Sequence, residues 1–155
     1  YELLRVLTDY GHADTAWSLM FQDTFPSWLY QLKYGAATIW ENWKGMEEGM
    51  PPKDSMNHYS FGTFAGWLMD RAAGIRVENG KIQIQPFPDR RIGHVKASYD
   101  SPFGKIDSSW KYSGQLCTLK IKIPANTEAE IRLPDGRFYQ VGCGEYGYEI
   151  VEEHR

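Results

Sequence analysis

The sequence has little cysteine and histidine, on which disulfide frameworks and many metal sites depend. Its two cysteines, Cys117 and Cys143, form no CxxC pair, and we expect two buried thiols rather than a disulfide. The four histidines, at positions 12, 58, 94 and 154, lack the spacing of metal ligands. A phosphate loop, a nucleophile elbow and a dinucleotide-binding glycine motif are also missing. We therefore expect no metal and no cofactor.

The sequence also lacks a strong excess of one charge and any long apolar run. It carries 17 Lys and Arg against 20 Asp and Glu, a formal net charge of −3 with both signs interspersed. This balance argues against nucleic acid as a partner, and the apolar runs are too short for a membrane span. Hydrophobic residues make up 42% of the chain, which is sufficient for a folded core.

The first residues, Tyr1 to Arg5, have neither an initiator methionine nor the pattern of a secretory signal. They open within a helical pattern instead. We therefore expect the chain to be a piece of a longer protein, so that its start carries no information on localisation.

The first half of the chain, residues 1–74, has the periodicity of helices. Apolar and small side chains recur three and four positions apart over residues 13–24, which predicts a helix that stops before Pro26. A short capped helix is predicted over residues 27–34, and another helix over residues 60–72.

Residues 36–57 show no regular period and contain several glycines and prolines. A connection of this length in a compact domain is usually functional or disordered, and its aromatic residues favour a functional loop. Glu47 and Glu48 lie beside Gly49 and a pair of prolines, so we expect them at a solvated loop tip.

From residue 75 onward the hydrophobic period changes to two. Residues 75–85 alternate around Asn79-Gly80, which predicts a β-hairpin with a type I′ turn. Further short strands are predicted at residues 95–99, 105–111, 116–123, 129–133, 137–141 and 148–151. Strands at this spacing are typical of an antiparallel β-sandwich. The prediction is an α+β chain in two parts, with helices in residues 1–74 and a β-sandwich in residues 75–155.

One carboxylate, Glu41, lies between two indoles in the segment Gly35 to Trp43. A carboxylate can move a proton or position a water, and indoles offer flat apolar faces for the C–H face of a sugar ring. Residue types alone favour a simpler interpretation, in which Trp40 and Trp43 are core residues and Glu41 is a solvated acid.

Several sequence blocks widen this context and run in order along almost the whole chain. They are Leu3-Leu4, Leu7, Tyr10-Gly11, Ala13 and Ala16; Phe25 to Trp28; Gly35 to Glu41; Ser55 to Gly62; Ala97 to Gly104; Ile123 to Thr127; and Leu133 to Gly136. In order and spacing these blocks resemble the α-L-rhamnosidases of glycoside hydrolase family 78. Ala37 departs from the family, which usually has Thr there, but this position lies beside the Glu41 motif.

The resemblance implies an (α/α)6 catalytic barrel followed by a β-sandwich. Residues 1–74 would then be the last arc of the barrel, with helix faces left exposed or covered by another copy of the chain. The family hydrolyses glycosides with inversion, which requires a general acid and a general base. Glu41 matches the general base. The general acid would lie upstream of Tyr1, in a missing N-terminal part of the same polypeptide, so the isolated fragment should be inactive.

The resemblance also implies substrate contacts. His58 matches a family histidine that contacts rhamnose hydroxyls, whereas its position alone equally allows packing against Tyr59. Trp40 and Trp43 would form apolar walls for the methyl group of rhamnose. The expected partner is a glycoside or glycan that contains rhamnose, with no nucleic acid and no membrane.

Two other functions are compatible with the sequence. The chain could be a non-catalytic carbohydrate-binding or structural module built on the β-sandwich. Its parent could also be another inverting (α/α)6 glycosidase that acts on a glucoside or a uronide, although a uronide would favour Arg or Lys in the pocket over a Trp-rich motif.

Overall fold

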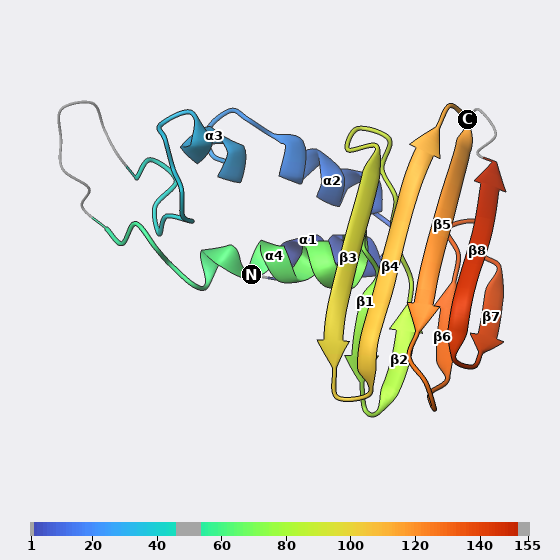
Figure 1. Ribbon diagram of the computed structural model, residues 1–155. Helices are drawn as coiled ribbons and strands as arrows, with labels where there is room; N and C mark the ends of the chain where they lie inside the picture. Colours follow the sequence, from blue (N-terminus) through green and yellow to red (C-terminus); the bar gives the residue numbers. More distant parts are fainter. Residues whose placement is uncertain (1, 46–53, 152–155) are drawn as a thin grey trace. The chain divides into compact units, whose positions relative to one another are not determined.

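The computed structural model describes residues 2–45 and 54–151. It divides into two compact units, Tyr1–Trp67 and Leu68–Arg155. The first unit contains helices and loops, and the second contains all of the described strands (Figure 1). None of the described helices has the length and apolar character needed to span a membrane.

The helical unit consists of short helices joined by loops. They are α1 (Leu3–Asp9), α2 (Ala13–Phe21), α3 (Trp28–Leu32), the 3-10 turn η1 (Phe61–Thr63) and α4 (Phe64–Trp67). The predicted cap of α3 is confirmed, because the Ser27 side chain accepts a hydrogen bond from the backbone N–H of Tyr30 at 3.1 Å. The predicted helix over residues 60–72 is divided, since a π-helix follows α4.

The core of the helical unit joins its first and last helices. The Trp17 and Trp67 rings meet edge to face, with centroids 4.9 Å apart. Trp67 Nε1 donates to Thr8 Oγ1 at 2.9 Å, and that hydroxyl donates in turn to the Leu4 carbonyl at 2.8 Å. All four side chains are buried. A hydrogen-bonded pair therefore fixes α4 against α1.

Several large apolar side chains of the helical unit are nevertheless exposed. They are Leu3, Val6, Tyr10, Phe25, Leu32, Tyr34, Tyr59 and Phe61. If the helices form one arc of a larger helical barrel, the neighbouring helices of that barrel would cover such side chains.

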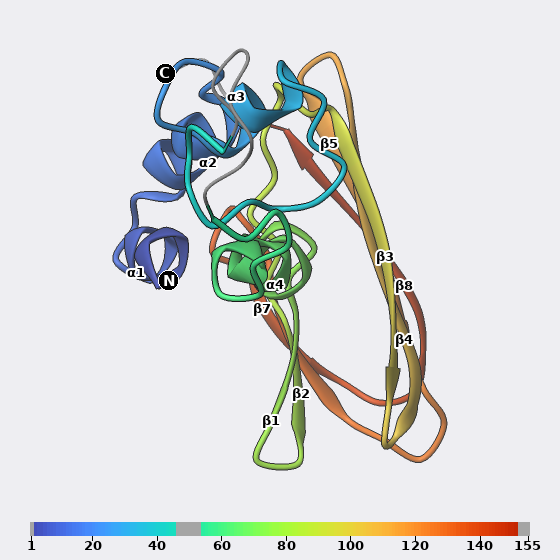
Figure 2. The same cartoon turned by 90° about the vertical axis from the view of Figure 1, so that its left-hand side faces the viewer.

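The second unit begins with the π-helix η2 (Leu68–Ala72) and continues with eight strands. These are β1 (Ile75–Glu78), β2 (Lys81–Ile84), β3 (His94–Ser101), β4 (Gly104–Ser113), β5 (Leu116–Ile123), β6 (Ala129–Arg132), β7 (Phe138–Val141) and β8 (Gly144–Val151). They form two sheets, of order β1-β2-β6-β7 and β3-β4-β5-β8. Figure 2 shows these sheets face to face, and the inward side chains of Ile84, Ile106, Leu119 and Ile131 are fully buried. The predicted sandwich is therefore present.

The predicted hairpin and one unexpected pairing define the smaller sheet. Asn79 and Gly80 both have positive φ, 50° and 75°, as the type I′ turn requires. Strand β2 then pairs with β6 in parallel, with Ile82 opposite Ala129. An alternating pattern does not distinguish parallel from antiparallel neighbours, so the sequence did not indicate this pairing. The long connection through β3, β4 and β5 supplies the crossover that a parallel pair needs.

Residues immediately before β1 belong to the sandwich core. Trp110 Nε1 donates to the Ala72 carbonyl, and Ser108 Oγ donates to the Ala73 carbonyl, both at 2.7 Å. Ala72 and Ala73 are fully buried. The compact sandwich unit therefore begins ahead of the change in hydrophobic period at residue 75.

The two cysteines lie in different surroundings, and both are free. Cys117 is buried in β5, as expected, whereas Cys143 is exposed in the turn before β8. The prediction of two buried thiols is therefore correct only for Cys117. Cys143 is exposed because it lies between two glycines, which provide no side chains to cover it.

Candidate functional site

The Glu41 motif lies in a loop whose two ends run side by side. The backbone N–H of Glu41 donates to the Ser55 carbonyl at 2.9 Å, and that of His58 donates to the Ile39 carbonyl at 2.8 Å. The Thr38 hydroxyl also bonds to the Met56 carbonyl. These bonds bring residues 38–42 and 54–58 together, although many residues separate them in the sequence. Glu47 and Glu48 lie outside the described residues.

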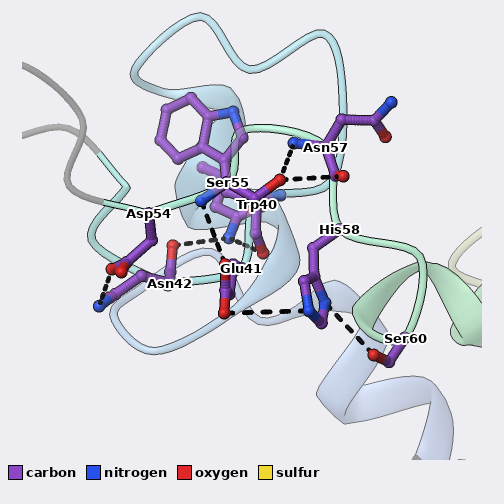
Figure 3. Close-up of polar contacts among 9 residues, drawn as sticks. Trp40, Glu41, Asn42, Asp54, Ser55, Asn57, His58 and Ser60 are labelled. Atoms are coloured by element: carbon purple, nitrogen blue, oxygen red, sulfur yellow. Dashed lines mark hydrogen bonds and ion pairs between the residues drawn. The ribbon is translucent and has the colours of Figure 1, made fainter.

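The Glu41 carboxylate has a different neighbour at each oxygen (Figure 3). Oε2 accepts the backbone N–H of Ser55 at 3.1 Å. Oε1 lies 3.9 Å from Nε2 of His58, and 44% of the Glu41 side chain is exposed. One oxygen is thus held by the backbone, while the other faces an imidazole at a site that water reaches. Such an arrangement suits a group that orients a water and accepts its proton.

His58 has a polar neighbour at each ring nitrogen and an aromatic neighbour at its face. Its Nε2 faces Glu41, and its Nδ1 lies 3.4 Å from the hydroxyl of Ser60. Its ring also stacks on Tyr59, at a centroid distance of 5.7 Å and an angle of 20°. The imidazole is 25% exposed, so it is partly accessible while its orientation is restrained from several sides.

The environment of Trp40 differs from the expected one, in which its indole would form an exposed wall of the sugar pocket. Its side chain is only 3% exposed. The backbone at Gly45, with φ of 45°, packs so closely on the indole that a Cβ atom there would overlap the ring. In this structure the ring offers no face for stacking, because the chain folds back over it at Gly45.

Trp43 belongs to a cluster of aromatic rings. It meets Trp28 edge to face at 5.4 Å and Phe61 at 6.0 Å, while Trp28 also contacts Phe64 at 5.0 Å. The Trp28 indole N–H donates to the Phe61 carbonyl at 3.2 Å. Trp43 is only partly buried, and through Phe61 this cluster reaches His58, at a ring distance of 5.2 Å. The site therefore has an aromatic border on the His58 side.

Gln31 is a residue of this site whose role the sequence did not indicate, as is Ser55. Its side chain is 1% exposed and bonds to the backbone of Trp40 and Asn42, on both sides of Glu41. The available signal was its spacing of four from the cap residue Ser27, which places both on one face of α3. Both residues are buried, whereas Leu32 at the end of the same helix is 59% exposed.

Within residues 2–45 and 54–151, no three His, Cys, Asp or Glu side chains lie close enough together to hold an ion. The neighbouring carboxylate of Asp54 accepts a hydrogen bond from the Asn42 side chain at 3.2 Å. The Glu41 carboxylate and the His58 imidazole are the two ionisable groups that face each other in this site.

The two halves of the chain match two adjacent protein-family models. Residues 2–72 match the bacterial alpha-L-rhamnosidase 6 hairpin glycosidase domain, and residues 79–147 match the bacterial alpha-L-rhamnosidase C-terminal domain. Among curated proteins, the chain is 36% identical over 139 residues to an alpha-L-rhamnosidase of Formosa agariphila and 34% identical to one of Streptomyces avermitilis. Each alignment covers 85% of this chain but only 15% and 14% of the relatives, so the chain spans a small part of their length.

Solved structures give the same result. The Streptomyces avermitilis alpha-L-rhamnosidase complexed with L-rhamnose matches with a TM-score of 0.85 and 30% identity, covering 96% of this chain and 17% of that one. The enzyme from Aspergillus terreus matches with a TM-score of 0.88 and 28% identity, covering 96% of this chain and 18% of that one. The matched portion is the C-terminal part of these relatives. The chain therefore belongs to the α-L-rhamnosidase family, with its helices in the six-hairpin glycosidase domain and its β-sandwich in the C-terminal domain.

Proposed function

We propose that this chain is the C-terminal part of an inverting glycoside hydrolase that releases terminal α-L-rhamnose from glycosides or polysaccharides. In this proposal Glu41 is the general base, which takes a proton from the water that attacks the anomeric carbon. The observation that carries it is the pairing of Glu41 with His58, 3.9 Å apart, on neighbouring segments of a six-hairpin glycosidase domain.

The geometry at Glu41 is suited to this role. The backbone N–H of Ser55 occupies Oε2, so Oε1 is the oxygen that faces His58 and is available to a water. A base must lie within hydrogen-bond reach of the proton that it removes, and a carboxylate held at one oxygen presents the other in a defined direction.

We assign sugar contacts to His58 and Trp43. An imidazole both donates and accepts hydrogen bonds, which suits the hydroxyls of a sugar in the −1 subsite. Trp43 and its aromatic neighbours would provide an apolar border for the methyl group of a 6-deoxy sugar. Because Trp40 is buried, we propose that its indole stabilises the loop by packing against the backbone at Gly45, and that it does not stack on the sugar.

The proposal requires a general acid from outside this chain. In an inverting glycosidase the acid and base carboxyl groups stand roughly 6.5–9.5 Å apart, with the sugar and water between them. We propose that the N-terminal part of the same polypeptide supplies this acid, so that the 155 residues alone do not hydrolyse an aryl α-L-rhamnoside.

The test is Glu41→Gln in the full-length protein, assayed on an aryl α-L-rhamnoside. The amide keeps the shape of the side chain but is a poor proton acceptor, so kcat should fall by about 10²–10⁴-fold while rhamnose binding is retained. Glu128→Gln is a matched control, because Glu128 is an exposed glutamate of the sandwich unit. Activity of Glu41→Gln within about tenfold of wild type would refute the assignment. Absence of any activity in the wild-type enzyme, with retained glycan binding, would favour a non-catalytic module.

A further inference from the structure

Gln31 is a buried polar side chain that the proposed reaction does not itself use. It comes from α3 (Trp28–Leu32) and is 1% exposed. A buried side-chain amide is costly unless its donors and acceptor are paired, so its partners indicate which part of the structure it serves.

Among the described residues, the hydrogen bonds of the Gln31 side chain reach the backbone on either side of Glu41. Gln31 Oε1 accepts the N–H of Trp40 at 3.3 Å. Gln31 Nε2 donates to the carbonyl of Trp40 at 3.5 Å and to the carbonyl of Asn42 at 3.3 Å. One amide thus holds both the residue before Glu41 and the residue after it.

We propose that Gln31 is a positioning residue for the general base: by fixing the backbone at Trp40 and Asn42, it sets the place and direction of the Glu41 side chain. This inference rests on the proposed role of Glu41. The segment from Trp40 to Asn42 lies in neither a helix nor a strand, so regular backbone pairing does not fix it. Catalysis is sensitive to such freedom, because a displacement of about 1 Å can cost on the order of 10²-fold in rate.

The helix that carries Gln31 is itself well anchored. Its first turn is capped by the buried Ser27 side chain, which lies one turn before Gln31 on the same face. The adjacent Trp28 bonds to the Phe61 carbonyl at 3.2 Å. The amide therefore projects from a fixed support toward the Glu41 loop.

Ser55 and Gln31 restrain Glu41 at different points. Ser55 bonds to the carboxylate and to the backbone of Glu41 itself, at 3.1 and 2.9 Å. Gln31 bonds to the flanking peptides. Together these contacts fix both ends of a side chain that is otherwise 44% exposed. Loss of Gln31 should leave the carboxylate present but displaced, which lowers the rate more than it lowers binding.

The experiment compares Gln31→Met with a buried polar control, both in the full-length enzyme. Gln31→Met keeps the approximate volume and removes all three bonds. Thr8→Val is the control, because Thr8 is 2% exposed and bonds to Trp67 in the same helical unit, away from Glu41. We expect Gln31→Met to lower kcat, measured per titrated active site, by about 10–100-fold with KM within about threefold. Thr8→Val should lower only the melting temperature. Gln31→Leu, which is also neutral and similar in volume, serves as a second variant if Gln31→Met does not fold.

A double mutant separates positioning from general stability. If Gln31 acts through the Glu41 carboxylate, then Gln31→Met in a Glu41→Gln background should lower the residual kcat by less than about twofold. The proposal is overturned if the folded Gln31 variants keep kcat within about twofold of wild type, or if their loss is equally large in the Glu41→Gln background. Either result would leave the proposed role of Glu41 as the general base unaffected. Full activity of Glu41→Gln alone would instead refute both proposals.

Discussion

Glu41 and Ser55 form a reciprocal pair. Glu41 donates its backbone N–H to the Ser55 carbonyl at 2.9 Å, and Ser55 returns its own N–H to the Glu41 carboxylate at 3.1 Å. The backbone of one segment thus holds both the main chain and the side chain of the proposed base. These two hydrogen bonds also join the two ends of the loop that contains the Glu41 motif.

The Ser55 N–H can be tested apart from its side chain. Ser55→Pro removes the donor to Glu41 Oε2. We expect kcat to fall by about tenfold or more, because a carboxylate that is no longer held at one oxygen is not fixed in the direction of the water. Ser55→Ala keeps that N–H and loses only the hydroxyl contacts with Asn57, at 3.0 and 3.2 Å. Its kcat should stay within about threefold of wild type. Equal kinetics for the two variants would show that the N–H does not serve the base.

His58→Ala should raise KM and lower kcat of the full-length enzyme. A contact to a sugar hydroxyl that tightens in the oxocarbenium-like transition state contributes to both binding and rate. A residue that only packs against Tyr59 would behave differently, because its loss lowers the melting temperature and leaves the kinetics of the folded fraction unchanged. Melting temperature and active-site-titrated kinetics on the same variant distinguish the two. Tyr59→Ala is the control for packing, since it removes the stacked ring and leaves the imidazole in place.

The change in sequence period predicts a domain boundary near Gly74, and from the contacts of the sandwich we propose that the sandwich unit begins earlier, at Leu68. A protein that starts at Leu68 should fold cooperatively, and one that starts at Ile75 should melt at a lower temperature. The shorter chain lacks the Ala72 and Ala73 carbonyls, so Trp110 and Ser108 lose buried partners, each at a cost of about 1–3 kcal/mol. Circular dichroism melts of both proteins measure this difference. Identical melting temperatures would place the boundary at residue 75.

Local chemistry in the sequence predicted much of the fold. Asn79-Gly80 determines a turn with two positive φ angles, and Ser27 can cap only the helix that follows it. Long-range relationships were harder to predict. The parallel pairing of β2 with β6 depends on which edges meet in space, and alternation along a strand is the same for either direction.

For the site too, the sequence indicated which residue types were of interest, but it did not indicate the environment of each side chain. Glu41 and His58 were singled out, and the structure brings their side chains to 3.9 Å; their roles in catalysis stay predictions. A tryptophan suits a sugar-binding wall and a core equally well, so the burial of Trp40 depended on how the chain turns at Gly45. The role of Gln31 is not predictable from the sequence, because a glutamine in a short helix is usually solvated and its partners here are backbone atoms, which have no sequence signature.

The parallel pairing of β2 and β6 has a consequence for biosynthesis. On the ribosome, the β1–β2 hairpin is made first, while its partner strand, Ala129–Arg132, is made only after β3, β4 and β5. During that interval β2 has an unpaired edge with Ile82 and Ile84 on its apolar side. Unpaired edges of this kind recruit strands from other chains, and non-local pairing is slow to form. The early hairpin therefore presents an unpaired strand edge to other chains until β6 has been synthesised.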